Sequence, residues 1–311
     1  MLESLKKLSN RSIISNIEVS VILTTYNRIE FLEEAIDSIL ASTFTSFEFI
    51  IVDDNSNDGT YELLQRKALE HPIIQLHQNE IHLGEFRNRN VGANYSKGKY
   101  LKYVDSDDLI FPNTIEQLYN CMEAHPNAGL GVILAKKTDN KVELFMPSEA
   151  YARHFFGEET LSIGPSSTII RKDVFNTLGG FANKRFVADS ELWLRIAGNY
   201  PVLTIHKNLV VWRRHKKQEF NIGMQSGKYL QMTYPIYMEQ LTLHKNLLKD
   251  SDWIKINSRL NWKHARDILS LFFRRAKFSL AIQTFLDSNL TVKQLLIGFK
   301  SYESMKKYFL P

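Results

Sequence analysis

Cysteine is almost absent from this sequence. Cys121 is the only cysteine among 311 residues, which excludes an intrachain disulfide framework and a cysteine-rich zinc site. No apolar run reaches the ~18 residues needed to cross a bilayer. Met1–Glu18 also lacks the apolar segment of a secretory signal. These absences predict a protein that works in the reducing cytoplasm.

Acidic residues are scarce in the last third of the chain. From Phe220 onward there are 14 Lys and Arg against 6 Asp and Glu, whereas the whole chain carries a net charge of +5. A basic excess of this kind attracts polyanions such as anionic lipid, although a solvated basic face is the plain alternative. Apolar residues at 44% and charged residues at 23% are ordinary for a globular protein. This composition excludes a disordered chain and a coiled coil.

Three apolar, β-branched runs alternate with stretches whose apolar residues recur at helical spacing. The runs are EVSVILTTYN (18–27), FEFIIVDD (47–54) and KYLKYVD (99–105). Strands that alternate with helices of about ten residues are typical of βαβ units. The pattern therefore predicts an α/β protein with a mostly parallel sheet.

Each of these runs ends in polar side chains, at Thr24–Arg28, Asp53–Ser56 and Asp105–Asp108. Ligands of open α/β sheets bind beyond the carboxyl ends of the strands, so this is the expected position of a binding site. Clustered acids repel each other, which is costly unless a cation or hydrogen-bond donors lie nearby. Taken singly, each cluster also fits an ordinary turn or a helix cap.

Asp105 and Asp107 are separated by one residue, so both carboxylates can reach one divalent cation. Mg²⁺ and Mn²⁺ prefer oxygen ligands, often one or two carboxylates together with substrate phosphates. At the end of the first run, the Tyr26 ring is suited to stacking on a nucleobase. A carboxylate at the end of the second run can accept a hydrogen bond from a base or a ribose hydroxyl.

The strand-end motifs occur in one order with further segments. These are VSVILTTYNR, FEFIIVDDNSNDGT, HLGEFRNRNVGANYSKGKYLKYVDSDD, GPSSTIIRKDVFNTLGGF (164–181), ADSELWLRIA (188–197) and WRRH (212–215). Together they resemble the inverting glycosyltransferases of family 2, which have the GT-A fold. The resemblance covers roughly residues 18–216 of the 311. It is specific because the motifs match in both order and spacing.

The resemblance implies a GT-A-type sheet flanked by helices, with a Rossmann-like nucleotide-binding half and a C-terminal helical region. We expect an N-terminal extension at 1–17 and a catalytic domain at 18–219. Within that domain, 18–112 is the nucleotide-sugar half and 113–219 the acceptor half. The helical region follows at 220–311.

The resemblance also assigns the donor site. Tyr26 and Asp54 are expected to hold the nucleobase, by stacking and by hydrogen bonding. Thr25 and Asp53 are expected beside them. Arg87 is expected along the nucleotide cleft, although a solvated helix face is the alternative for that residue.

The metal site follows from the same resemblance. Asp105 and Asp107 match its DXD motif, with Asp107 as the direct ligand of Mn²⁺ or Mg²⁺. His215 matches a position near the diphosphate and the metal. A lone histidine at a strand end is also often structural.

The catalytic base is expected at Asp189, at the start of a helix that faces the acceptor. The family usually has an acidic pair here, and this chain has Ala188 in place of the first acid. Glu191 matches another commonly acidic position in the same helix, so it stays an alternative base.

The implied reaction is metal-assisted transfer of a sugar from a nucleoside diphosphate sugar to a glycan or lipid-linked acceptor, as in polysaccharide biosynthesis. UDP is the family's commonest nucleotide. A nucleotidyltransferase is disfavoured because 24–28 contains no glycine for a phosphate-binding loop. A catalytically degenerate scaffold protein is the non-enzymatic alternative. No motif supports nucleic-acid binding.

Two regions lie outside the motifs. Residues 136–160 have weak periodicity, which predicts a variable and mobile stretch. Leu260–Leu286 places Arg274, Arg275 and Lys277 between apolar positions. This segment either lies on anionic membrane at the inner face of the cell membrane or packs on the catalytic domain or a second copy. We favour packing because the apolar positions are numerous.

Overall fold

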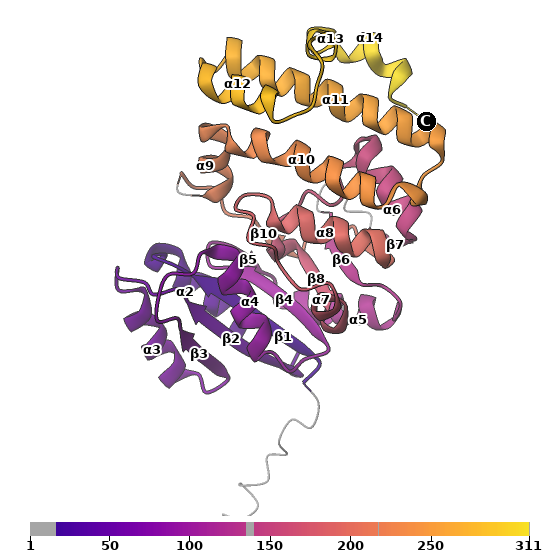
Figure 1. Cartoon of the computed structure of the whole chain (residues 1–311). Coiled ribbons are helices and arrows are strands. Elements are labelled where there is room, and N and C mark those ends of the chain that lie inside the picture. The colour runs from indigo at the N-terminus through magenta and orange to yellow at the C-terminus, as the bar shows by residue number, and fades with distance from the viewer. Residues whose placement is uncertain (1–16, 135–139, 217, 311) are drawn as a thin grey trace, which may run out of the picture.

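The computed structural model describes residues 17–134, 140–216 and 218–310. Its centre is an eight-stranded sheet with the order β3-β2-β1-β4-β8-β6-β9-β7 (Figure 1). Neighbouring strands are parallel except where β8 and β7 pair with their partners. The strands are β1 (Val19–Thr25), β2 (Phe47–Asp53), β3 (Ile74–Gln78), β4 (Tyr100–Asp105), β6 (Leu130–Ile133), β7 (Val142–Phe145), β8 (Thr168–Arg171) and β9 (Val202–Ile205). The predicted α/β class with a mostly parallel sheet is confirmed.

Both faces of the sheet are buried, which explains why the strands are apolar runs rather than alternating patterns. Val21 and Leu23 of β1 pack on one side, whereas Ile22 belongs to the core on the other side. The first core contains α2 (Ile29–Leu40), α3 (Thr60–Glu70) and α5 (Thr114–Glu123). The second contains α4 (Glu85–Tyr95), α6 (Pro147–Arg153) and α8 (Ala188–Asn199).

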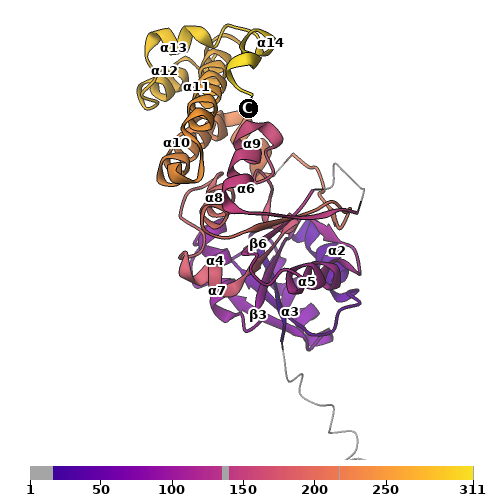
Figure 2. The same ribbon diagram turned by 90° about the vertical axis from the view of Figure 1, so that its right-hand side faces the viewer.

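The C-terminal helices stack on one end of the α/β part (Figures 1 and 2). Ile236 of α10 and Ile256 of α11 join the core around α8, so the helical region shares a core with the sheet. Among the helices of the described residues, none combines the length and apolarity needed to cross a membrane. The helices are α9 (Glu219–Ser226), α10 (Lys228–Leu243), α11 (Asp250–Phe273), α12 (Phe278–Leu286), α13 (Val292–Ile297) and α14 (Tyr302–Met305); a short α7 (Lys172–Thr177) follows β8.

The expectation of a variable, mobile stretch at 136–160 is wrong for most of that range. Residues 142–145 form the edge strand β7, which pairs antiparallel with β9, and 147–153 form α6. Tyr151 of α6 is fully buried in the second core. The positions 136–139 lie outside the described residues.

Candidate active site

The ends of β1, β2 and β4 lie side by side, as the strand-end motifs require. Thr25 pairs in register with Asp53, and Thr24 with Asp105. The Ser56 hydroxyl donates to Asp53 at 2.5 Å and accepts from the Asn27 backbone N–H at 2.9 Å. The fully buried Asp53 therefore organises the two strand-end loops through Ser56, which is a structural role beside the predicted binding site.

Asp54 lies beneath the loop that leads into α4. Its carboxylate accepts from the backbone N–H groups of Leu83 and Gly84, both at 2.8 Å. Asn79 Nδ2 donates to it at 2.7 Å, and His82 Nδ1 lies 2.9 Å from Oδ2. A carboxylate has about four acceptor sites, so these partners fill it. Gly84 has φ +89°, a left-handed conformation that favours glycine.

The Tyr26 ring stacks on the imidazole of His82. The two ring centroids are 3.9 Å apart and their planes are inclined by 28°. His82 thus makes both contacts that the sequence assigns to a nucleobase, stacking on Tyr26 and bonding to Asp54. Beside it, the buried Thr25 Oγ1 has no hydrogen-bond partner in the described part of the chain. An orphaned hydroxyl at a strand end is expected where a ligand supplies the partner.

Arg89, two residues after the predicted Arg87, is the arginine of α4 that bonds to the acidic loop. Arg87 is exposed on α4, whereas Arg89 is buried and bonds to Glu85 at 2.7 Å and Asp105 at 2.5 Å. Burial lowers the pKa of Arg89, but the two carboxylates outweigh burial and raise it. The sequence carried a signal for this residue, because Glu85 and Arg89 have the i,i+4 spacing of a helical ion pair.

The acidic loop after β4 is joined to the segment after β10 (Val210–Val211), which pairs antiparallel with β5 (Leu109–Ile110). This pairing brings His215 to Asp107, with 2.7 Å between Nε2 and Oδ2. The imidazole stacks on Phe31 at 4.5 Å. Arg213 Nε donates to the Asp107 carbonyl at 2.6 Å, so it fastens the loop rather than facing it as a free cation.

The side chains around Asp107 supply some, but not all, of the ligands that a divalent cation needs. Asp107 and His215 supply an oxygen and a nitrogen side by side, and the buried His215 Nδ1 has no partner among the described residues. Asp105 Oδ1 is held by Arg89 instead. Within residues 17–134, 140–216 and 218–310, no group of three or more His, Cys, Asp or Glu side chains is arranged to hold a metal. Phosphate oxygens of a donor would have to complete the ligand set.

Asp189 lies in the first turn of α8, where its Oδ1 accepts from the Ser190 backbone N–H at 2.7 Å. Burial raises its pKa to about 7, and the nearby negative charges of Glu85 and Asp105 act in the same direction. A carboxylate with such a pKa is suited to proton transfer near neutral pH. Ala188 is fully buried in the second core, so the missing acid of the motif is replaced by a core side chain.

Glu191 is placed differently. It is buried and pairs with Arg195 at 2.9 Å, one turn further along α8. Arg195 also donates to the carbonyl groups of Leu178 and Gly180. Glu191 therefore fixes the turn before α8, which favours Asp189 as the base.

Tyr229 of α10 lies next to the first turn of α8, which the sequence did not reveal. Burial raises its pKa to about 12, and the negative charge of Asp189 adds to this shift, while a hydrogen bond to Ser190 opposes it. Tyr229 lies 40 residues beyond Asp189 on a helix outside the motifs. No local pattern marks it, because only tertiary packing brings α10 to α8.

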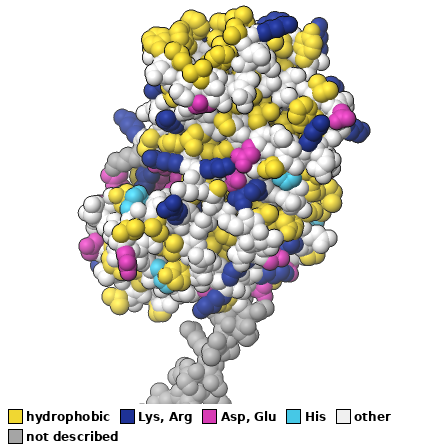
Figure 3. Space-filling view, viewed as in Figure 1, with side chains coloured by type: hydrophobic (Ala, Val, Ile, Leu, Met, Phe, Trp, Pro, Cys, Tyr) yellow, Lys and Arg dark blue, Asp and Glu magenta, His cyan; other side chains and the backbone are white. Residues whose placement is uncertain are grey.

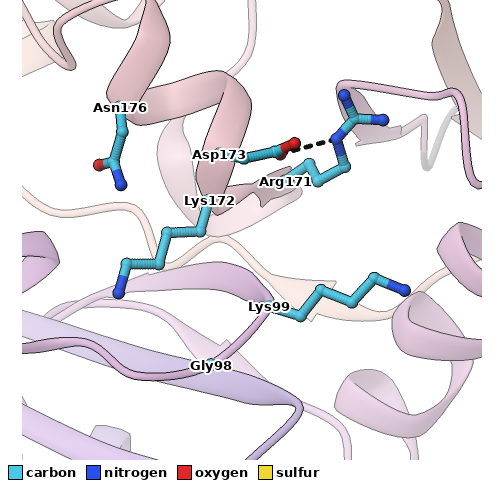
Figure 4. A pocket seen from close by; sticks show the side chains of 6 residues that line it. All are labelled: Gly98, Lys99, Arg171, Lys172, Asp173 and Asn176. Carbon is cyan, nitrogen blue, oxygen red and sulfur yellow. Dashed lines mark hydrogen bonds and ion pairs between the residues drawn. The ribbon is translucent and has the colours of Figure 1, made fainter.

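A shallow hollow of about 400 Å³ lies at the opposite edge of the sheet, at the start of β4 and the end of β8 (Figure 4). Its three cations are already engaged. Lys99 pairs with Glu123, Arg171 with Asp173, and Lys172 donates to the Ser96 carbonyl. Its position and its occupied cations separate it from the strand-end site.

The mostly parallel sheet, with acids beyond its strand ends, defines an α/β protein of the open-sheet class, whose ligands bind beyond the carboxyl ends of the strands. The model of the family described as "Glycosyl transferase family 2" matches residues 20–181. The chain belongs to this family, and the resemblance drawn from the motifs is confirmed.

Similar proteins agree with this assignment. An uncharacterized glycosyltransferase of Methanocaldococcus jannaschii is 30% identical over 205 residues, covering 63% of this chain and 70% of that protein. Glycosyltransferase GlyG of Streptococcus pneumoniae is 26% identical, covering 66% and 75%.

Solved structures share the fold. S. aureus TarS 1–349 in complex with UDP-GlcNAc matches with a TM-score of 0.61 and 17% identity, covering 94% of this chain and 80% of that one. The mannosyltransferase PcManGT from Pyrobaculum calidifontis, in complex with GDP-Man and Mn²⁺, has a TM-score of 0.59 and 18% identity, covering 99% and 90%. At these identities the likeness establishes the GT-A-type fold.

Proposed function

We propose that the chain transfers a sugar from a UDP-sugar to a hydroxyl group of a glycan or lipid-linked acceptor, with inversion at the anomeric carbon. One continuous set of contacts carries this proposal. It runs from Asp54 through α4 to the acidic loop, and Asp189 lies beside the same charges. Incubating the chain with UDP-, GDP- and dTDP-sugars and Mn²⁺ tests it, because slow donor hydrolysis needs no acceptor. The proposal would be overturned if the chain hydrolysed none of these nucleotide sugars.

The chemistry is a single in-line displacement. The bond from the anomeric carbon to the diphosphate oxygen breaks while the acceptor oxygen bonds to that carbon, through an oxocarbenium-like transition state. The acceptor proton passes to the Asp189 carboxylate. Asp107 and His215 would hold Mn²⁺ or Mg²⁺, which when bound offsets the charge of the departing diphosphate.

The choice of nucleotide rests on the family's preference and on the TarS complex with UDP-GlcNAc, whereas PcManGT was solved with GDP-Man. Calorimetric titration with UDP, GDP and dTDP, each with and without Mn²⁺, distinguishes these donors. Metal-dependent binding of UDP supports the transferase. If none of the three nucleotides binds, the scaffold alternative is favoured.

We expect His82→Ala to bind UDP more tightly than the wild-type chain. A nucleobase can reach Asp54 only by displacing a partner, and His82 is the one partner held by neither the backbone nor a second buried contact. Removing a competing hydrogen bond worth about 0.5–1.5 kcal/mol predicts a gain of about two- to tenfold. Calorimetry measures it.

His77→Ala is the matched control for His82→Ala. His77 stacks on Tyr95 at 3.6 Å but contacts none of the strand-end acids assigned to the donor. We expect its UDP affinity to equal that of the wild-type chain. Weaker UDP binding by His82→Ala would show instead that the His82 imidazole contributes to binding of the nucleobase.

The C-terminal helices also suit contact with an anionic membrane, as a peripheral protein of the cytoplasmic face. Part of the 260–286 segment packs as its numerous apolar positions favoured, because Leu260 joins the core around α8 while Ile268, Leu271 and Ala281 form a core between α11 and its neighbours. The other side of these helices leaves large apolar side chains in solvent, with Phe273 66% and Phe299 60% exposed. Figure 3 shows apolar side chains gathered over this end of the molecule, with basic ones beside them. Exposed apolar and basic groups together favour anionic lipid over a second copy.

Flotation with phosphatidylglycerol vesicles checks this contact. We expect salt-sensitive binding that Phe273→Ser with Phe299→Ser abolishes. Leu69→Ser with Ile81→Ser, which removes two exposed apolar side chains from the nucleotide half, should leave binding intact. Equal flotation with neutral vesicles, or none with anionic ones, would contradict the contact.

A further inference from the structure

Three aromatic side chains from separate elements form a row along the site. Trp212 follows β10, Phe220 belongs to α9 and Tyr229 to α10. The Trp212 and Phe220 centroids are 6.0 Å apart, and those of Phe220 and Tyr229 are 5.7 Å apart. Trp212 is 49% exposed and Phe220 46% exposed. Large aromatic rings are usually buried, so two neighbouring exposed ones need a reason. We call these three residues the aromatic row.

The two ends of the aromatic row adjoin the acidic loop and the start of α8. Trp212 directly precedes Arg213, which bonds to the Asp107 carbonyl in the acidic loop. At the other end, Tyr229 hydrogen-bonds to Ser190, the residue directly after Asp189 in the first turn of α8. An acceptor whose hydroxyl gives its proton to Asp189 would therefore lie near the Tyr229 end of this row.

The geometry of the rings suits a sugar. Adjacent rings are inclined by 79° and 71°, so they meet edge to face; each such contact occupies one face of one ring, whereas a stack occupies a face of both rings. A pyranose ring has an apolar face of C–H groups, which packs on an aromatic face, and a rim of hydroxyl groups. Charged groups that could bond to such a rim adjoin the row, because Glu219, which directly precedes Phe220, pairs with Arg185 at 2.9 Å.

Charged groups beside the aromatic row argue against a lipid chain as the occupant. Arg214 lies over the Trp212 ring at 5.2 Å, and Glu219 directly precedes Phe220. A hydrocarbon tail would desolvate these groups without offering hydrogen bonds in return. We propose that the aromatic row is the acceptor subsite and that it binds a saccharide ring of the acceptor. This inference rests on the proposed function, and it identifies the acceptor as a glycan at the point of contact.

Saturation-transfer NMR with the full chain tests the subsite. The probes are cellobiose, lactose, chitobiose and mannobiose at millimolar concentration. We expect at least one to receive saturation from the wild-type chain and to lose about tenfold in affinity with Phe220→Ala or Trp212→Ala, as expected for an aromatic contact of about 1.4 kcal/mol. Trp212→Phe, which keeps a ring, should recover part of the binding. Phe273→Ala, an exposed phenylalanine on α11, is the matched control and should bind as the wild type does.

UDP titration of the same samples separates this inference from the proposed function. Sugar binding that depends on the aromatic row, together with UDP binding, supports both. Saturation of no disaccharide, or binding that both alanine variants retain, overturns the acceptor subsite while UDP binding leaves the donor assignment intact. Sugar binding that depends on the aromatic row, without binding of any nucleotide, leaves a saccharide subsite and overturns the transferase.

Discussion

Asp189→Asn is expected to slow sugar transfer by about 10²- to 10⁴-fold, the usual contribution of general base catalysis. Asparagine has nearly the same shape and can still accept from the Ser190 N–H, so the start of α8 should keep its structure. The amide cannot take a proton from the acceptor hydroxyl. Nucleotide affinity should stay nearly unchanged, because among the described residues no hydrogen bond or ion pair joins Asp189 to Tyr26 or Asp54. Initial rates and UDP calorimetry on one preparation measure both quantities.

The pH profile gives this prediction a second readout. Burial raises the pKa of Asp189 to about 7, and the base works only when it is ionised. Transfer by the wild-type chain should therefore fall as the pH drops through about 7, with the limb missing in Asp189→Asn. Glu191→Gln is the control on the same helix. It breaks the pair with Arg195 and should lower the melting temperature but keep the pH limb. A limb that vanishes only in Glu191→Gln would transfer the role of base to Glu191.

The parallel part of the fold was predictable because its signals are local. Over 19–105 the buried strands β1, β2 and β4, of 6–7 residues, alternate with helices, of which α2 and α3 are amphipathic, and parallel strands direct their carboxyl ends to one edge. The edge strand β7 carries no such signal. It has four residues, partly exposed, and only its pairing with β9 makes it a strand. Periodicity cannot be read from so short a segment.

The site was predictable where one residue type determines the chemistry. Acids at strand ends were expected and are found there. The remaining contacts depend on direction and on tertiary packing. Arg87 and Arg89 are two positions apart, about half a turn of helix, so only one of them can face Glu85 and Asp105. His82 contacts the Asp54 carboxylate from a loop whose conformation depends on Gly84. Neither contact follows from residue type alone.

Asp107→Ala is expected to remove Mn²⁺-dependent UDP binding and to lower transfer by at least ~10²-fold. Loss of a group that merely orients a metal ligand already costs about 10- to 100-fold in metal affinity, so loss of a ligand should cost more. The change also strips His215 of its partner at 2.7 Å, which leaves the imidazole held by the Phe31 stack. Electron paramagnetic resonance of free Mn²⁺, with and without UDP, measures metal binding independently of turnover.

Asp173→Ala is the matched control for Asp107→Ala. Asp173 is an exposed acid beside the hollow at the opposite edge of the sheet, and its ion pair with Arg171 is remote from the strand ends. Asp173→Ala should bind Mn²⁺ and UDP as the wild-type chain does.

Asp105 is already paired with Arg89. Asp105 therefore cannot replace Asp107 as a metal ligand without breaking a buried ion pair, which is costly. Undiminished Mn²⁺ binding in Asp107→Ala would mean that Arg89 releases Asp105 when the donor arrives, and that Asp105 is the principal ligand.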